Sequence, residues 1–432
     1  MEKENRKGFT KGLLVGILSG MLGMFIVSAV IGVIGINFFT AEIKKAGDKS
    51  DVVEFVEGNE GPYGGIMVEL SETESFILGK VGYLINLIDS EFLFDYDFDE
   101  VVDGIYYGMM SALNDVYTTY YNEEEFNELM ESTEGVYYGI GVRVSQSYAT
   151  GVITVTKTFP DTPAMEAGVL PGDILVGVDD EDITGMDLNL VVSKIKSEDE
   201  GSTVKITVVR DGEYVSMDVE RRRVEYPTVE YEMLDNKIGY LQLVEFDSVS
   251  VEQFKEALTA LNAQGMEGIV LDLRDNPGGT LDSVVKILDM LLGECTIIYT
   301  EDKDGNISNK YMSDADKLLN VPAVVLVNGN SASAAEVFAG DMQDNKAATL
   351  VGTTTFGKGI VQQIYPIGDG SAVKVTQSSY YTSAGRNIHG TGIEPDVVVE
   401  LDEELKTKSV IEKSEDNQLQ KALEVLAGKM GD

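Results

Sequence analysis

One stretch decides the fold of this 432-residue chain: Val321-Pro-Ala-Val-Val-Leu-Val-Asn-Gly-Asn-Ser-Ala-Ser-Ala-Ala-Glu336. It opens with an apolar run, passes through a turn of small residues and ends at a helix start, which predicts a buried strand followed by a helix. A serine at such a turn is exposed to a cleft, and the helix N-terminus offers free N–H groups that suit a developing oxyanion. Ser331 and Ser333 are therefore candidate nucleophiles. The alternative is that the serine only caps the helix, its commonest role at this place.

Strands alternate with helices on both sides of this stretch. The periodicity predicts strands at 238–243, 268–273 and 321–327, with helices at 251–261, 281–292 and 334–342. Such alternation implies a layered α/β core. The pattern is β-rich at 135–225, helical at 76–130, and that of an amphipathic helix at 414–429. We therefore expect a multidomain chain with α/β and α+β parts.

The composition narrows the class of protein. Asp and Glu number 74 against 33 Lys and Arg, which gives a net charge of −41. This charge argues against a nucleic-acid partner, because binding the phosphates needs clustered Lys and Arg. Hydrophobic residues make up 43%, enough to bury cores. With one cysteine, Cys295, no intrachain disulfide can form. With one histidine, His389, a site of several histidines is impossible, and we expect no metal and no cofactor.

The N-terminus predicts the location. Residues 13–39 are 27 consecutive uncharged positions, and a helix of that length exceeds the roughly 30 Å hydrocarbon core of a bilayer. Basic residues precede the run, so the positive-inside rule places the N-terminus in the cytoplasm and the remaining chain outside. The alternative is a cleaved signal peptide, whose apolar region is about 7–15 residues. We expect a single-pass membrane anchor.

Two short segments between 135 and 225 stand out together. The first is Tyr138-Gly-Ile-Gly-Val142, where successive N–H groups can form a nest for a carboxylate. The second, about 25 residues later, is Thr162-Pro-Ala-Met-Glu-Ala-Gly-Val-Leu-Pro-Gly-Asp-Ile-Leu175. In this order and spacing the two segments resemble a PDZ domain, which binds a peptide C-terminus as an added strand. The resemblance assigns the carboxylate to the backbone N–H groups of Gly139, Ile140 and Gly141.

A lysine follows the predicted nucleophile in Thr354-Thr-Phe-Gly-Lys-Gly-Ile-Val-Gln-Gln363. Lys358 stands between glycines and among apolar residues, where loss of solvation would let its neutral amine act as a base. A Ser–Lys dyad needs no histidine. The alternative is an ordinary surface charge. A further element, Leu271-Asp-Leu-Arg-Asp-Asn-Pro-Gly-Gly279, is a strand that ends in a tight glycine turn, and its N–H groups could complete an oxyanion hole.

These motifs, in this order, resemble the carboxyl-terminal processing peptidases, also called tail-specific proteases. The resemblance covers about 76–428 and includes Gly108-Met-Met-Ser-Ala-Leu-Asn-Asp-Val-Tyr117, Gly390-Thr-Gly-Ile-Glu-Pro-Asp396 and the helix from Asp416 to Leu426. It implies that Ser333 is the nucleophile, Lys358 the base and Gln362 the residue that orients the lysine. It also implies that the oxyanion donors are the N–H of Ala334 and one from the turn at Gly278 and Gly279, without choosing between the two glycines.

The resemblance implies a domain order and a function. It gives a tail and anchor at 1–45, a linker at 46–75, a helical dimerisation segment at 76–130, a PDZ domain at 131–225, a crotonase-like layered protease core at 226–405 and a C-terminal helix at 406–432. The expected enzyme is a serine endopeptidase that takes protein or peptide substrates with apolar C-termini. A homodimer through the first and last helical segments is expected from the same resemblance.

The chain departs from the family at two places. Asn114-Asp-Val-Tyr117 stands where Asp-Asp-Pro-Tyr is frequent, and Ile195-Lys-Ser197 stands where the family commonly has Ile-Arg-Gly. In some relatives that arginine couples the PDZ domain to the protease. The catalytic positions show no departure.

The sequence offers two alternatives to this function. Ser283-Val-Val-Lys286 fits the S-x-x-K motif of penicillin-binding acyl-serine enzymes, but neither Ser-Asp-Asn nor Lys-Thr-Gly occurs in the chain. A PDZ adaptor with a dead protease core would not need the intact Ser333, Lys358 and Gln362. His389 is interpreted as structural, beside the strand lead-in at 390–396.

Overall fold

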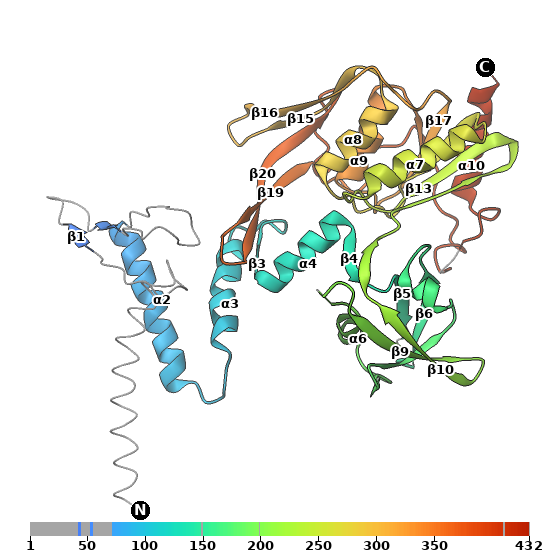
Figure 1. Ribbon diagram of the computed structural model, residues 1–432. Helices are drawn as coiled ribbons and strands as arrows, with labels where there is room; N and C mark the ends of the chain where they lie inside the picture. Colours follow the sequence, from blue (N-terminus) through green and yellow to red (C-terminus); the bar gives the residue numbers. More distant parts are fainter. Residues whose placement is uncertain are drawn as a thin grey trace, which may run out of the picture. The chain divides into compact units, whose positions relative to one another are not determined.

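The computed structural model describes residues 42–44, 52–54, 71–147, 150–197, 199–408 and 411–431 (Figure 1). The described residues fall into two compact units, one made of those up to 126 with 362–376 and the other of 127–361 with those from 377 onward. The predicted membrane helix at 13–39 lies outside the described residues. Among those that are described, none of the helices is both long and apolar enough to span a bilayer.

The first unit is built on two helices, α2 (Glu72–Glu91) and α3 (Phe98–Ser111). Helix α2 begins before residue 76, where the helical segment was expected, because Ser71 and Glu74 form a capping box. Strand β3 (Thr119–Tyr121) follows, and helix α4 (Glu123–Glu134) begins here and continues into the second unit. Strands β1 (Glu42–Lys44) and β2 (Val52–Glu54) pair with each other.

The PDZ-like part of the second unit is a five-strand path with the order β10-β9-β7-β6-β5. Its strands are β5 (Val142–Gln146), β6 (Ile153–Thr158), β7 (Ile174–Val178), β9 (Thr203–Arg210) and β10 (Glu213–Glu220), with β8 (Glu181–Asp182) beside β7. Helices α5 (Pro163–Ala167) and α6 (Leu188–Ile195) cover it, and β4 (Val136–Gly139) pairs with β11 (Arg222–Glu225). Strand β5 has one paired neighbour and so forms a sheet edge.

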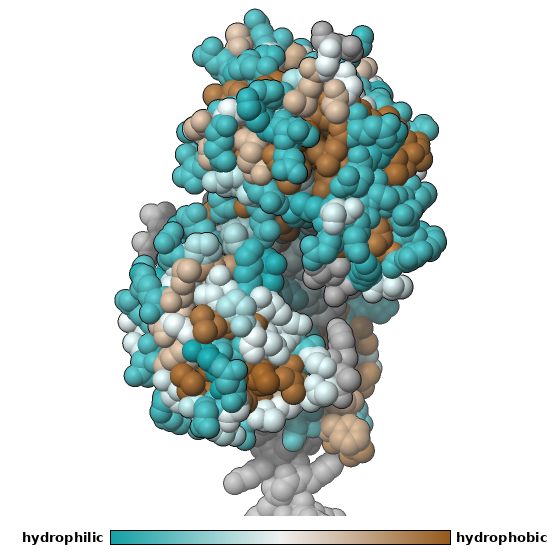
Figure 2. Space-filling model, turned by 90° about the vertical axis from the view of Figure 1, so that its right-hand side faces the viewer, coloured by the Kyte–Doolittle hydropathy of each residue, from teal (hydrophilic) through white to brown (hydrophobic). Residues whose placement is uncertain are grey.

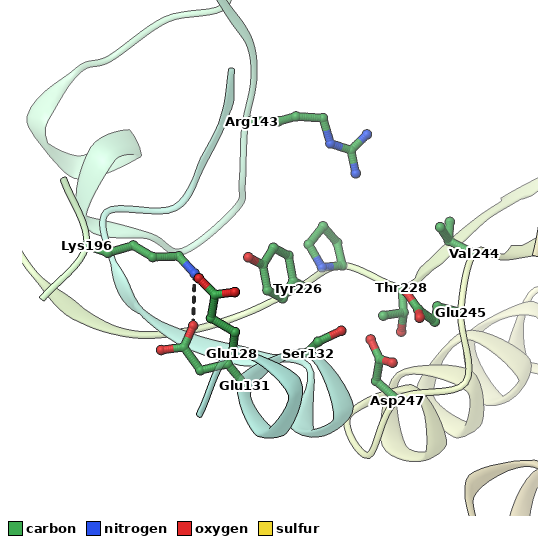
Figure 3. Close-up of a pocket in the computed structure, with 11 residues that line it drawn as sticks. Glu128, Glu131, Ser132, Arg143, Lys196, Tyr226, Thr228, Val244, Glu245 and Asp247 are labelled. Carbon is green, nitrogen blue, oxygen red and sulfur yellow. Dashed lines mark hydrogen bonds and ion pairs between the residues drawn. The ribbon is translucent and has the colours of Figure 1, made fainter. Parts of the chain in front are cut away.

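Lys196, which stands at the departure from the family pattern, follows α6 directly. Its ammonium lies 2.9 Å from a carboxylate oxygen of Glu131 on α4 (Figure 3). The ammonium also lies 5.3 Å from the ring centroid of Tyr137, a cation–π distance. Lys196 therefore ties the PDZ-like part to α4.

The α/β core of the second unit contains a six-stranded sheet with the order β12-β13-β14-β17-β18-β21, in which β12 alone is antiparallel to its neighbour. The strands are β12 (Val229–Met233), β13 (Ile238–Leu243), β14 (Gly268–Asp272), β17 (Ala323–Val327), β18 (Thr349–Gly352) and β21 (Val397–Val398). Strands buried on both faces read as continuous apolar runs, which is why β13, β14 and β17 could be predicted.

Helices cover both faces of that sheet. Helices α7 (Ser250–Ala263), α8 (Leu281–Leu291) and α9 (Ala334–Asp344) pack on the face that carries Leu241, Leu271 and Val325. The opposite face, which carries Val270 and Val324, is covered by α10 (Asn417–Met430). The α/β layering expected from the sequence is confirmed.

A second sheet was not predicted. It has the path β16-β15-β20-β19 and comprises β15 (Cys295–Glu301), β16 (Ile307–Ser313), β19 (Ile360–Pro366) and β20 (Ala372–Thr382). Strand β3 pairs with β20 at its start. It could not be predicted because its half-exposed strands lack a long apolar run.

On the face shown in Figure 2 hydrophilic residues predominate, as the acidic composition leads one to expect.

Candidate active site

Ser331 is a structural residue of the turn after β17. Its side chain is fully buried, and its Oγ donates to the Leu273 carbonyl at 2.7 Å and accepts the Asn328 N–H at 3.0 Å. These bonds fasten the turn to the end of β14. The hydroxyl is thus committed within the protein.

Ser333 occupies the N-cap position of α9, as the capping interpretation required, but with an unusual backbone. Its φ is 54° and its ψ is −116°, whereas an N-cap residue ordinarily has an extended backbone. A non-glycine residue held in such a region costs about 1–3 kcal/mol, and these residues cluster at functional sites. Ser333 is half-buried, unlike Ser331.

The glycine turn lies directly against Ser333. A Cβ on Gly278, whose φ is 111°, would come within 2.8 Å of the Ser333 Cβ and 3.0 Å of the Ala334 nitrogen. A Cβ on Gly279, whose φ is 134°, would lie 2.5 Å from the Phe246 carbonyl oxygen. Both positions therefore require glycine.

The backbone donors of this region are not equivalent. The Gly278 N–H donates to the Asn276 side-chain oxygen at 2.8 Å. For the N–H groups of Gly279 and Ala334 no acceptor is found among the described residues. Ala334 begins α9, where the first N–H groups have no partner inside the helix.

Glu336 joins two segments: the serine turn, which contains Ser333, and the lysine loop, which contains Lys358. Its carboxylate is fully buried. One oxygen accepts the N–H groups of Ser333 at 2.9 Å and Lys358 at 2.8 Å, while the other accepts the Thr355 hydroxyl at 2.6 Å and the Gly357 N–H at 2.7 Å. Sequence reasoning missed this role, although an Ser-x-x-Glu capping-box pattern with a carboxylate in an apolar helix could have signalled it.

The lysine loop is packed closely through its glycines. A Cβ on Gly357 would lie 3.1 Å from the Gly392 nitrogen, and one on Gly359 would lie 2.6 Å from the His389 nitrogen. Lys358 is half-buried between these two buried glycines. The backbone of His389 packs against this loop, and His389 as a whole is exposed. This position fits the interpretation of His389 as a structural residue.

Tyr380 is a second residue that sequence reasoning missed. Its hydroxyl lies 3.3 Å from the Ser333 carbonyl oxygen, and its N–H donates to the Gly359 carbonyl at 3.1 Å. Burial, with the charges of Glu336 and Asp341 adding to it, raises the pKa of Tyr380 well above its usual value. The hydroxyl therefore remains a donor at the serine turn.

The remaining predicted site residues lie on other elements. Gln362 is on β19, where its amide donates to the Thr376 hydroxyl at 3.4 Å. Gly139, Ile140 and Gly141 are buried at the start of the β5 edge. Gly141 has a φ of 85°, which favours glycine.

The S-x-x-K alternative does not assemble a site. Ser283 is buried on α8 and its hydroxyl donates to the Asp247 carbonyl at 2.9 Å. Lys286 pairs with Asp282 at 2.6 Å on the exposed side of the helix. The two side chains thus lie in different environments, one buried and the other exposed.

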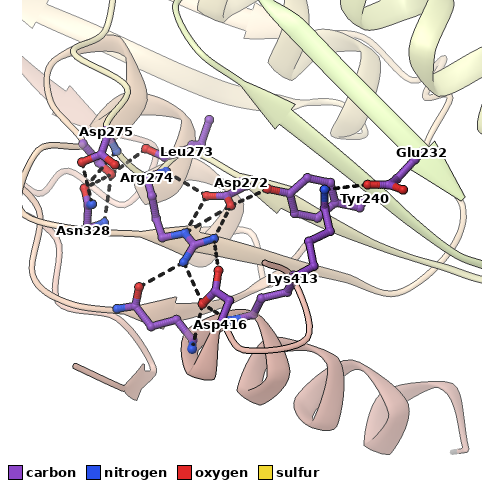
Figure 4. Close-up of polar contacts among 12 residues, drawn as sticks. Glu232, Tyr240, Asp272, Leu273, Arg274, Asp275, Asn328, Lys413 and Asp416 are labelled. Carbon is purple, nitrogen blue, oxygen red and sulfur yellow. Dashed lines mark hydrogen bonds and ion pairs between the residues drawn. The ribbon is translucent and has the colours of Figure 1, made fainter. Parts of the chain in front are cut away.

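The strand that leads to the glycine turn is held by a buried ion network (Figure 4). The Arg274 guanidinium lies 2.6 Å from a carboxylate oxygen of Asp272 and 2.8 Å from one of Asp416, which caps α10. The Tyr240 hydroxyl also donates to Asp272, at 2.8 Å. The network fixes the end of β14 against the C-terminal helix.

Replacing Glu336 by Gln is expected to lower kcat about 10–100-fold and the free energy of unfolding by about 1–3 kcal/mol. A glutamine has one acceptor oxygen, so its NH₂ group would face two buried donors. The exposed Glu256→Gln is the matched control. Steady-state kinetics on a fluorogenic peptide measure the effect, and a kcat within twofold of wild type would contradict the role of Glu336 in joining the two segments.

The comparisons with known proteins cover this region. The model of peptidase family S41 matches residues 237–399, and the PDZ domain model matches 138–220. A carboxy-terminal-processing protease of Bartonella bacilliformis is 33% identical over 330 residues, covering 75% of this chain and 75% of that protein. Carboxy-terminal processing protease CtpA of Bacillus subtilis is 31% identical over 349 residues, covering 80% and 73%. The solved photosystem II D1 C-terminal processing protease matches 76% of this chain and 88% of its own, with 29% identity and a TM-score of 0.44.

Proposed function

The chain belongs to peptidase family S41 as a PDZ-containing, serine-type carboxyl-terminal processing peptidase, and on this basis we propose that it cleaves peptide bonds through a Ser333–Lys358 dyad. Ser333 Oγ attacks the substrate carbonyl carbon and Lys358 Nζ accepts the hydroxyl proton. That proton passes to the leaving amine as the C–N bond breaks, and water then hydrolyses the acyl ester. The observation that carries the proposal is the Glu336 carboxylate, one oxygen of which binds the N–H groups of both residues.

The proposed oxyanion hole consists of the N–H groups of Gly279 and Ala334. Gly279 is preferred over Gly278 because the Gly278 N–H already binds Asn276. Gln362 is proposed to orient Lys358, a role taken from the family pattern. Gln362→Ala is expected to lower kcat more than it raises KM, and a change in KM alone would contradict that role.

The PDZ domain is proposed to bind the substrate's C-terminal carboxylate at the N–H groups of residues 139–141. A hydrogen bond to a charged group contributes about 1.5–3 kcal/mol, so amidation of a peptide's C-terminus should raise its KM about 10–100-fold. Gly141→Ala should remove this difference, because a Cβ there would meet Thr162 at 2.3 Å. Equal KM values for the acid and the amide would contradict carboxylate recognition.

The proposed location is the cell membrane, with residues 13–39 as a single anchor, the N-terminus in the cytoplasm and the catalytic body outside. The support is the uncharged run and the basic residues that precede it. The chain should then sediment with membranes, and a protease added to intact spheroplasts should digest it. Recovery of the full chain in the soluble fraction would contradict the anchor.

A homodimer is proposed through the first and last helical segments. Several large apolar side chains of the first unit are exposed, among them Phe76, Tyr83, Leu93, Phe94 and Met109. Exposed apolar side chains in one region are typical of a contact surface. Light scattering on residues 46–432 should give a dimer mass, and a monomer at about 10 µM would contradict the proposal.

A further inference from the structure

A cavity of 330 Å³ opens beside the core sheet (Figure 3). Its walls come from α4, from β5 and the residue after α6, and from two core segments, Tyr226 to Thr228 and Val244 to Asp247. The function proposed above does not use these core segments.

Glu245 and Asp247 form what we call the acid end of the cavity. They flank Phe246, whose side chain is buried in the core. Asp247 is 5% exposed, and Figure 3 shows its carboxylate directed toward the cavity. Over the whole described part of the chain, neither carboxylate receives a hydrogen bond or a cation.

Ionisation of these two carboxylates is unfavourable in the free protein. Burial, with the charge of Glu245 adding to it, raises the pKa of Asp247 to about 7. Burial also raises the pKa of Glu245. A cation placed at the acid end would stabilise both ionised carboxylates.

The basic residues of the cavity stand at its other side. Lys196 pairs with Glu131, and Arg143 lies with its guanidinium 5.9 Å from the Phe159 ring centroid. In Figure 3 both are well separated from Asp247. The protein itself therefore leaves the acid end without a counter-charge.

The acid end is joined directly to the proposed oxyanion turn. The Phe246 N–H donates to the Gly278 carbonyl at 2.7 Å, and the Thr280 N–H donates to the Phe246 carbonyl at 2.8 Å. Gly278 in turn lies against Ser333. An extended peptide advances about 3.3 Å per residue, so side chains a few residues from the cleaved bond can reach this end.

We propose that Glu245 and Asp247 bind a lysine or arginine side chain of the substrate, a few residues from the cleaved bond. The inference rests on the proposed peptidase function and adds a specificity to it. The alkyl stem of the basic side chain packs on Tyr226, Pro227 and Val244, which line the same cavity. The charged head forms charge-assisted hydrogen bonds with the carboxylates.

A lysine scan tests this specificity. In peptides with one fixed apolar C-terminus, a single lysine is moved through the positions on both sides of the cleaved bond, and norleucine replaces it in each matched peptide. At one position kcat/KM for lysine should exceed that for norleucine about tenfold. In Asp247→Asn this ratio should fall below about twofold, while the exposed Glu256→Gln should keep it. A ratio near one at every position, or a tenfold ratio retained in Asp247→Asn, would overturn the proposal.

Binding to the Ser333→Ala variant separates this proposal from the peptidase function. Fluorescence anisotropy should give the same lysine preference without cleavage. A binding preference with no cleavage by wild type would reject the function and support the acid end. Cleavage by wild type without any lysine preference would support the peptidase function and reject the role of the acid end.

A pH series on the wild type covers the case in which Asp247→Asn does not fold. The charged or titratable groups that face Asp247 across the cavity are Glu128, Glu131, Arg143, Lys196, Tyr226 and Glu245. The lysine preference requires the ionised carboxylate, so it should be full about one pH unit or more above the pKa of Asp247, which is about 7, and fall as the pH drops through that pKa. A preference unchanged from pH 8 to pH 5.5 would overturn the proposal.

Discussion

Ser333→Ala and Lys358→Ala should each lower kcat/KM by at least about 10³-fold on a fluorogenic peptide with an apolar C-terminus. The first would remove the proposed attacking oxygen and the second the proposed base. Lys358→Arg should be equally inactive, because a guanidinium does not supply a neutral amine at working pH.

The matched control for the nucleophile is Ser331→Ala, two residues earlier in the same turn. Its hydroxyl binds Leu273 and Asn328 inside the protein, so the variant should be less stable by about 1–3 kcal/mol yet retain most of its activity when folded. Normal cleavage by Ser333→Ala would show that the assignment is wrong.

Arg274→Met should lower the stability of the protease core by about 3–5 kcal/mol, because it leaves the buried carboxylates of Asp272 and Asp416 without their cation. For a region of about 200 residues this corresponds to a fall of roughly 6–20 °C in the Tm of the core transition. Differential scanning calorimetry measures it. The arrangement also predicts lost activity, since Asp272 ends the strand before the glycine turn.

Lys286→Met is the matched control for this prediction. Lys286 and Asp282 also approach to 2.6 Å, but both side chains are more than half exposed. A surface pair contributes about 0–1 kcal/mol, so the Tm should change little. Equal shifts in the two variants would show that burial of the Arg274 network does not matter to stability.

Much of the core could be predicted because its strands are buried on both faces. The strand predicted at 238–243 is β13 residue for residue, and the helix predicted at 334–342 lies within α9. Ser333 could be placed at the start of that helix because it follows a buried strand and a turn of small residues. The second sheet was missed because β15, β16, β19 and β20 mix polar and apolar positions.

The contacts that assemble the site could not be predicted from local pattern. Glu336 receives its bonds from donors 19 to 22 residues away as well as from Ser333, and Tyr380 reaches Ser333 across 47 residues. The choice between Gly278 and Gly279 depends on the Asn276 side chain, which takes one of the two donors. Such choices follow from tertiary packing, on which a single sequence is silent.

The central claim is that Ser333 is the nucleophile that forms the acyl-enzyme. Mass spectrometry of the protein after reaction with a serine-directed fluorophosphonate tests it most directly. We predict one adduct, on Ser333, that is absent from Ser333→Ala and much slower to form in Lys358→Ala. An adduct on Ser331 or Ser283 would contradict the account, as would an active enzyme that remains unlabelled.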